Sequence, residues 1–435
     1  MAAQKMHLGW FTNFTLDAWN TPWASSNGPD WKGGFYVDLA RSLDRAGFDY
    51  LILEDTCMVS DAFGGDFVTS LKHGVFAPKH DPLPLVPLIA QATEGLGIVA
   101  TMSTTFYPPW LLARLSATLD HICDGRFGWN IVTSAEDRAA QNFGLDKMPE
   151  HDLRYDICDE YVDLVTRLWA SWEPDAVVMD RERGVYVDGT KVHTVDFDGQ
   201  YFKSRGPLNV VPSPQGKPVF VQAGASPRGK RFAAKSADSI IATAQGISGM
   251  RDYRDAVRAH MEEFGRKPDD CKVLFLVSPV LGDTEEEARE KHTAMYNHPD
   301  FIEQTLVSIS SITEIDFSQY DLDSPLPDDI TTNGERGSME KFIQRGSGKT
   351  LRQLASEGVS QSVELVGTPD SVAAQMGEIM EEVGGDGFLI TRQNLRLTRK
   401  YITEITEGLV PALQRRGLAR TGYTHEHFRD NLLEF

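Results

Sequence analysis

Polar side chains recur in this chain where short apolar runs end. Hydroxyl, amide and carboxyl groups at such positions can hold a ligand, because each offers a hydrogen-bond donor or acceptor. They are Asp55 after YLILE, Ser103 and Thr104 in the word STT, and Asn130 in WNIVTS. Each residue taken alone is more simply a turn former or a helix cap. Together they indicate a polar binding site.

The segment QAGASPRGKRFAAKSA has the composition of an anion site. Its small residues let backbone amides approach a ligand, Ser226 offers a hydroxyl, and Arg228 adds positive charge. A predicted helix follows directly, and helix N-termini favour anions such as phosphate. The segment therefore predicts a cofactor phosphate site, and a tight turn before a helix is the structural alternative.

A third group lies in EHDLRYDICDEYVDLVTRLWASW. His151 and Tyr155 are four residues apart, so they share one face of a helix near its start. At this spacing both side chains can reach one ligand. Packing or capping would explain the pair equally simply.

The sequence lacks the motifs of metal sites, serine hydrolases and common nucleotide-binding proteins. The chain has no HExxH word and no cysteine cluster, so we predict no metal site. It has no GxSxG elbow, no Walker A word and no GxGxxG fingerprint. The formal net charge is −20, from 63 acidic and 43 basic residues, which disfavours nucleic acid and anionic membranes as partners. We find no signal peptide and no membrane-spanning apolar stretch, and we expect a cytoplasmic protein.

These side chains need a scaffold, and the apolar runs indicate which one. Eight short β-rich runs each precede a segment of helical periodicity, as in YVDLARSLDRAG, where Leu39, Leu43 and Ala46 share a face and Gly47 ends the helix. This alternation predicts an α/β protein with a (β/α)8 TIM barrel, rather than an open sheet, in one domain over residues 1–435. The runs are HLGWF from His7, YLILED ending at Asp55, IVATMS ending at Ser103, WNIVTS from Trp129, PVFVQAGAS ending at Ser226, DSIIAT ending at Thr243, KVLFLVSPVLG ending at Gly282, and DGFLIT ending at Thr391.

Two long stretches interrupt the alternation. Residues 174–217, after the fourth strand, alternate polar and apolar residues and predict a β-rich insertion. Residues 297–361, after the seventh strand, predict a lid-like insertion, because long loops at this end of a barrel border the active site. Residues 417–435 form a C-terminal tail that we expect to be a polar extension of the closing helix.

Long words run in order from the first strand to about Arg416: STTFYPPWLLARLSATLDHICDGRFGWNIVTS, NFGLDK, EHDLRYDICDEYVDLVTRLWASWEPDA, HTVDFDGQYFKSRGPLNVVPSPQGKPVFVQAGASPRGKRFAAKSAD, VGTPDSVAAQM and DGFLI. They resemble the nitrilotriacetate monooxygenase component A group of bacterial luciferase-like, FMN-dependent two-component monooxygenases. The words are specific for this group and not for a substrate. The resemblance implies a luciferase-like TIM barrel.

The resemblance also implies cofactors and partners. Reduced FMN and O2 would form a C4a-peroxyflavin that oxygenates a small organic substrate at carbon, sulfur or nitrogen, with C–N or C–S cleavage as a possible sequel. A separate NAD(P)H:flavin reductase would supply the reduced FMN, and the chain would form a homodimer or homotetramer.

The implied FMN contacts fall on positions of this sequence. The phosphate end would fall on Tyr155 and Ser226, and Asp55, Ser103 and Asn130 would lie nearer the isoalloxazine. Thr104, His151 and Arg228 complete the predicted set. No catalytic acid or base is identified.

The sequence departs from the group at one informative position. After VTS the alkane-oxidising member carries a histidine next to the flavin, whereas this chain has Ala135. Phe14, Trp19 and Phe63 are candidates for the substrate pocket, and they could equally be packing residues. The alternative functions are an F420-dependent hydride-transfer oxidoreductase and a non-catalytic flavin-binding relative.

Overall fold

The computed structural model of the chain describes residues 5–15, 31–296, 299–327, 329–346, 348–357, 361–392 and 397–435. Eight parallel strands close into a barrel in the order β1-β14-β11-β10-β9-β4-β3-β2. All eight predicted runs are barrel strands, so the predicted TIM barrel is confirmed. The strands are β1 His7–Asn13, β2 Tyr50–Glu54, β3 Gly97–Ser103, β4 Phe127–Val132, β9 Val219–Ala223, β10 Ser239–Ala242, β11 Lys272–Val277 and β14 Gly387–Thr391.

Helices cover the outside of the barrel, and those that pack on it, such as α1, bury an apolar face against it. In α1 the side chains of Leu39, Leu43 and Ala46 are buried, and Gly47 ends the helix in the left-handed conformation at φ 81°, as predicted. The helices outside the second insertion are α1 Gly34–Ala46, α2 Val68–His73, α3 Leu85–Ala90, α4 Pro109–Ile122, α5 Asp137–Asn142, α6 His151–Trp169, α7 Pro227–Ser236, α8 Gly246–Glu263, α9 Glu285–Tyr296, α13 Pro369–Val383, α14 Arg399–Thr403, the π-helical turn η4 Glu404–Leu409, α15 Val410–Arg415 and α16 Phe428–Leu432.

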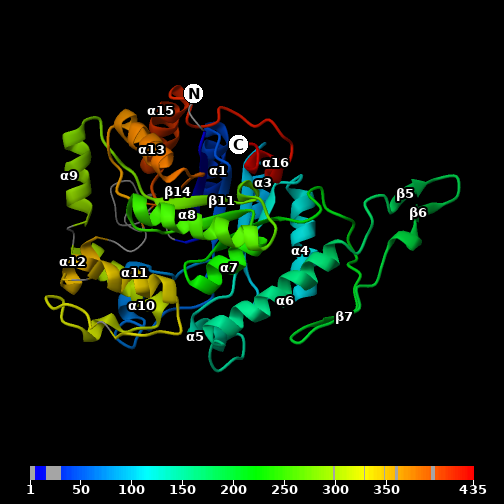
Figure 1. Cartoon of the computed structure of the whole chain (residues 1–435), viewed down its shortest axis with the longest axis horizontal. Coiled ribbons are helices and arrows are strands. Elements are labelled where there is room, and N and C mark those ends of the chain that lie inside the picture. The colour runs from blue at the N-terminus through cyan, green and yellow to red at the C-terminus, as the bar shows by residue number, and fades with distance from the viewer. Residues whose placement is uncertain are drawn as a thin grey trace.

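Residues 174–217 fold into two short antiparallel hairpins. The first pairs β5 Val177–Asp180 with β6 Val185–Val187, and the second pairs β7 Phe197–Asp198 with β8 Lys203–Ser204. A 3-10 turn, η1 Gly189–Lys191, lies between them. Figure 1 shows the β5–β6 hairpin projecting away from the barrel.

The described part of residues 297–361 is helical and has a small core of its own. It contains α10 Pro299–Thr313, the 3-10 turn η3 Phe317–Gln319, α11 Arg336–Gly346 and α12 Leu351–Ser356. Its buried apolar side chains include Phe317, Phe342 and Leu354. Side-chain contacts attach it to helices beside the barrel: Glu303 contacts Lys72 and His73 of α2, and Glu314 pairs with Arg138 of α5. The remaining short elements are η2 Pro268–Asp270 and the paired strands β12 Val280–Leu281 and β13 Val366–Gly367.

The C-terminal tail differs from the predicted polar extension. Phe428 and Leu432 of α16 are buried with the side chains that fill the barrel interior, such as Tyr50 and Val219. The backbone N–H of Phe428 donates to the carbonyl of Gly125, just before β4, so the tail closes the N-terminal end of the barrel. Sequence analysis missed this role because polar residues surround the two apolar ones.

Within the described residues, no helix is both long and apolar enough to cross a membrane.

Candidate active site

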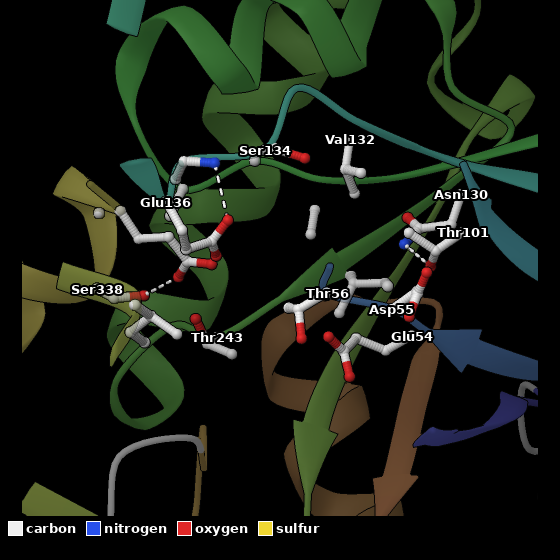
Figure 2. A pocket seen from close by; sticks show the side chains of 18 of the residues that line it. Glu54, Asp55, Thr56, Thr101, Asn130, Val132, Ser134, Glu136, Thr243 and Ser338 are labelled. Carbon is white, nitrogen blue, oxygen red and sulfur yellow. Dashed lines mark hydrogen bonds between the residues drawn. The ribbon is translucent and has the colours of Figure 1, made fainter. Parts of the chain in front are cut away.

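A cavity of about 430 Å³ lies at the C-terminal ends of the barrel strands. Its wall comes from the ends of β2, β3, β4 and β9, from the start of α6, and from the second insertion. Figure 2 shows Asn130 and Val132 of β4, Thr101 of β3 and Glu54 of β2 beside one space, with Glu136 and Ser338 on another side of it. This is the end at which TIM barrels carry their active sites.

The β3–β4 side of the cavity contains an unsatisfied acceptor. Thr101 and Asn130 are register partners on the two strands, and the Asn130 Nδ2 donates to Thr101 Oγ1 at 2.8 Å. Asn130 is 3% exposed, and its Oδ1 is buried with no hydrogen-bond partner in the part of the chain that the structure describes. Buried polar atoms normally have a partner, so this oxygen is positioned to accept a bond from a ligand N–H or O–H. Beside it, the hydroxyls of Ser103 and Ser134 are hydrogen-bonded at 2.8 Å.

Two adjacent carboxyl groups at the end of β2 have opposite protonation tendencies. Burial opposes ionisation of Glu54, but the Lys79 ammonium at 2.9 Å and the Asn13 amide at 2.9 Å outweigh it and hold the pKa of Glu54 below its usual value. No cation among the described residues is bonded to Asp55. Its burial, and then the neighbouring Glu54 carboxylate, raise the pKa of Asp55 to about 7. The end of β2 therefore places beside the cavity one carboxyl that is held ionised and one whose pKa lies near neutral.

The turn from β9 to α7 forms a tight cradle. The Ser226 hydroxyl caps α7 by accepting a hydrogen bond from the Gly229 N–H at 3.0 Å. A Cβ atom at Gly229 would lie 2.8 Å from the Tyr155 Oη, so glycine is needed to bring this phenol against the first turn of the helix. Burial raises the pKa of Tyr155 to about 12, which keeps the phenol protonated and able to donate. The His151 ring lies beside the Tyr155 ring, with centroids 5.3 Å apart.

The second insertion supplies the remaining wall. On α10, Phe301, Thr305, Ser308 and Ile312 line the cavity, and their spacing places them on one face of the helix. The start of α11 contributes Arg336, Gly337 and Ser338.

The structure brings most of the predicted cofactor residues to this cavity. The six that line it are Asp55, Ser103, Asn130, His151, Tyr155 and Ser226. Thr104 instead points away and hydrogen-bonds the carbonyl of Val132 through its N–H and its hydroxyl. The Arg228 side chain also lies outside the lining, because it pairs with Asp156 and Asp159 of α6.

The three predicted substrate-pocket residues are not part of this lining where the structure describes them. Phe14 packs against Tyr36 in the barrel core. Phe63 packs against the apolar cluster of the second insertion. Trp19 lies outside the described residues.

The charged residues of the wall that sequence reasoning missed include Glu136, Arg154 and Arg336. Glu136 is 6% exposed, and burial raises the pKa of its carboxyl. Arg154 stands between His151 and Tyr155 in the word EHDLRYD, and that position was the available signal. Arg336 comes from a distant insertion, and no local pattern marks it.

Among the described residues, no group of three or more His, Cys, Asp or Glu side chains is placed to hold a metal ion.

Comparison with known proteins agrees with this architecture. Residues 6–387 match the family model described as luciferase-like monooxygenase. Dibenzothiophene-sulfone monooxygenase of Rhodococcus erythropolis (strain XP) is 36% identical over 444 residues, which covers 99% of this chain and 96% of the relative. Nitrilotriacetate monooxygenase component A of Aminobacter aminovorans is 36% identical, and the alignment covers 92% of this chain and 89% of the relative.

A solved structure gives the same picture. The crystal structure of riboflavin lyase with modified FMN and substrate riboflavin superposes with a TM-score of 0.88 and 31% identity, covering 99% of this chain and 96% of that one. These matches confirm the predicted family, an FMN-dependent monooxygenase function, and FMN and O2 as cofactor and oxidant. The F420-dependent and non-catalytic alternatives are not favoured. The chain belongs to the luciferase-like monooxygenase family.

Proposed function

We propose that this cavity binds reduced FMN, with the phosphate at Tyr155 and Ser226 and the isoalloxazine against Asp55, Ser103 and Asn130. The observation that carries the proposal is that all five residues line one cavity, although they come from four strand ends and one helix. When bound, reduced FMN supplies the electrons that activate O2 for insertion into a small organic molecule.

The cavity has features that suit this cofactor. Its volume of about 430 Å³ is within the range of small-molecule sites. The unsatisfied Asn130 Oδ1 can accept from an N–H of the ring system. The phenol of Tyr155 and the first turn of α7 offer donors to a phosphate.

The chain's own residues have two further tasks. Oxygen activation by a reduced flavin requires that water be kept out, and we assign this to the second insertion, whose α10 and α11 line the cavity. The reaction also consumes protons where oxygen is reduced, and the buried carboxyl of Glu136 is one group in the wall that can hold a proton.

Phosphate binding gives the first prediction. Ser226→Ala and Tyr155→Phe should each weaken FMN binding about 10- to 150-fold, the loss of about 1.5 to 3 kcal/mol expected for one charge-assisted hydrogen bond. Anaerobic titration with reduced FMN measures this effect. Tyr201→Phe removes a more exposed phenol and serves as the control. If both site variants bind reduced FMN as tightly as the wild type, the phosphate does not bind at Tyr155 and Ser226.

A second prediction concerns the source of electrons. The chain has no dinucleotide fingerprint, and we propose that a separate NAD(P)H:flavin reductase provides the reduced FMN. The purified chain with FMN and NADH should consume almost no O2 until a reductase is added. An oxygen electrode records the difference, and rapid turnover by the chain alone would contradict the proposal.

The oligomeric state and the location in the cell stay predictions. We propose a homodimer or homotetramer in the cytoplasm, and light scattering of the purified chain tests the assembly.

A further inference from the structure

Two arginines on the α6 and α11 side of the cavity, Arg154 and Arg336, have no carboxylate partner in the described part of the chain. Arg154 of α6 is 3% exposed, and among the described residues its guanidinium donates only to the backbone carbonyls of Pro149 and Asn333. Its Nε is buried and makes no hydrogen bond to any of them. Arg336, in the first turn of α11, donates to the carbonyl of Thr332 and to no other described residue. Arg228, by contrast, is paired with two aspartates.

Such an arrangement is unfavourable without an anion. Taking a guanidinium out of water is costly, and backbone carbonyls compensate only part of its charge. The N-terminal end of α11, where Arg336 lies, adds the partial positive charge of the helix dipole. Two carboxyl groups also line this part of the cavity. Glu335 is exposed and accepts a hydrogen bond from Ser338, and Glu136 is buried, which raises its pKa and favours its uncharged form. These carboxyl groups therefore offset the positive charge of the two guanidinium groups only in part.

The start of α11 lies directly against the proposed phosphate cradle. A Cβ atom at Gly337 would lie 2.5 Å from the Cβ of Ala225 and 3.4 Å from the N of Ser226. Only a glycine permits this approach. The N-termini of α7, from the barrel, and α11, from the insertion, therefore converge on the same part of the cavity.

From this geometry we infer that Arg336 binds the FMN phosphate from the insertion side, with Arg154 behind it. The phosphate would thus be shared between the barrel and the insertion, and cofactor binding would fix the insertion over the cavity. This inference rests on the proposed placement of FMN. It adds a consequence: riboflavin, which lacks the phosphate, should bind without fixing the insertion.

The test compares reduced FMN with reduced riboflavin in the full-length chain by anaerobic titration. Arg336→Gln should lower FMN affinity about 10- to 150-fold and change riboflavin affinity less than about twofold, because only the phosphate contact is lost. Arg336→Lys keeps the charge and should retain most of the affinity for FMN. Arg352→Gln, on α12 of the same insertion and paired with Asp323, is the matched control and should bind both ligands normally.

Hydrogen exchange gives a readout that does not depend on activity. FMN should slow amide exchange in α10 and α11 of the wild-type chain, whereas riboflavin should not, and Arg336→Gln should abolish the FMN effect. The inference would be overturned if Arg336→Gln lost as much affinity for riboflavin as for FMN. It would also be overturned if that variant kept the full affinity for FMN. If Ser226→Ala still weakens FMN binding, the proposed function holds even though the inference about Arg336 is wrong. If wild-type protein binds neither flavin, the proposed function itself fails.

Discussion

Replacing Phe428 by alanine is expected to lower the free energy of unfolding by about 3 to 5 kcal/mol, the range found when a large buried aromatic side chain is truncated. Phe428 is fully buried at the N-terminal end of the barrel, and its ring centroid lies 5.8 Å from that of Tyr50. A Cβ atom at Gly97 would lie 2.6 Å from the Phe428 ring, so the strand and the ring are in close contact. The surroundings have little freedom to fill the space that the ring leaves.

Urea unfolding followed by circular dichroism measures this difference. The matched control is Leu433→Ala, five residues along the same tail, where the side chain is 37% exposed and the change should stay within about 0.5 kcal/mol. A Phe428→Ala variant as stable as Leu433→Ala would show that the tail does not close the barrel. FMN should still bind to folded Phe428→Ala protein, because the cavity lies at the opposite end of the strands.

The role of this tail could not be predicted from the spacing of apolar residues. The eight barrel strands were predictable because they are apolar along their length, as in β3, where every residue is buried. Helix α1 was predictable because its apolar face repeats over three turns. In α16 only Phe428 and Leu432 mark the buried face, and two residues four apart do not distinguish a barrel plug from a polar extension.

The candidate site was predictable to the extent that it depends on local position. Asp55, Ser103 and Asn130 come at strand ends, and the barrel brings all strand ends to one edge. Arg228 shows where this reasoning stops, since its partners Asp156 and Asp159 lie on a helix about 70 residues away. Arg336 was not predicted and does line the cavity, because its position depends on how a distant insertion packs against the β9–α7 turn.

Asp55→Asn is expected to stabilise the ligand-free protein, and the gain should grow with pH. Burial and the Glu54 carboxylate raise the pKa of Asp55 from 3.8 to about 7 on folding. Between these values the folded state binds more protons than the unfolded state, so the stability that the protonated carboxyl gives is complete below pH 3.8 and is lost as pH rises through 7. Asparagine does not titrate. The variant should therefore equal the wild type near pH 4 and exceed it by up to about 4 kcal/mol at pH 8, because each pKa unit corresponds to about 1.36 kcal/mol.

Comparing the two proteins at each pH cancels the titration of all other groups. Urea unfolding at pH 5, 6.5 and 8 gives the stability difference directly. Asp252→Asn, which changes an exposed carboxylate of α8, provides the control and should show no trend with pH. A difference between Asp55→Asn and wild type that stays constant from pH 5 to pH 8 would mean that Asp55 is already ionised across this range. An unfavourable buried carboxyl at this position is the pattern expected of a functional group, since active-site residues commonly lower stability. The same variant should consequently bind FMN with altered affinity even though it folds more stably, and a titration of the folded variant checks that separation.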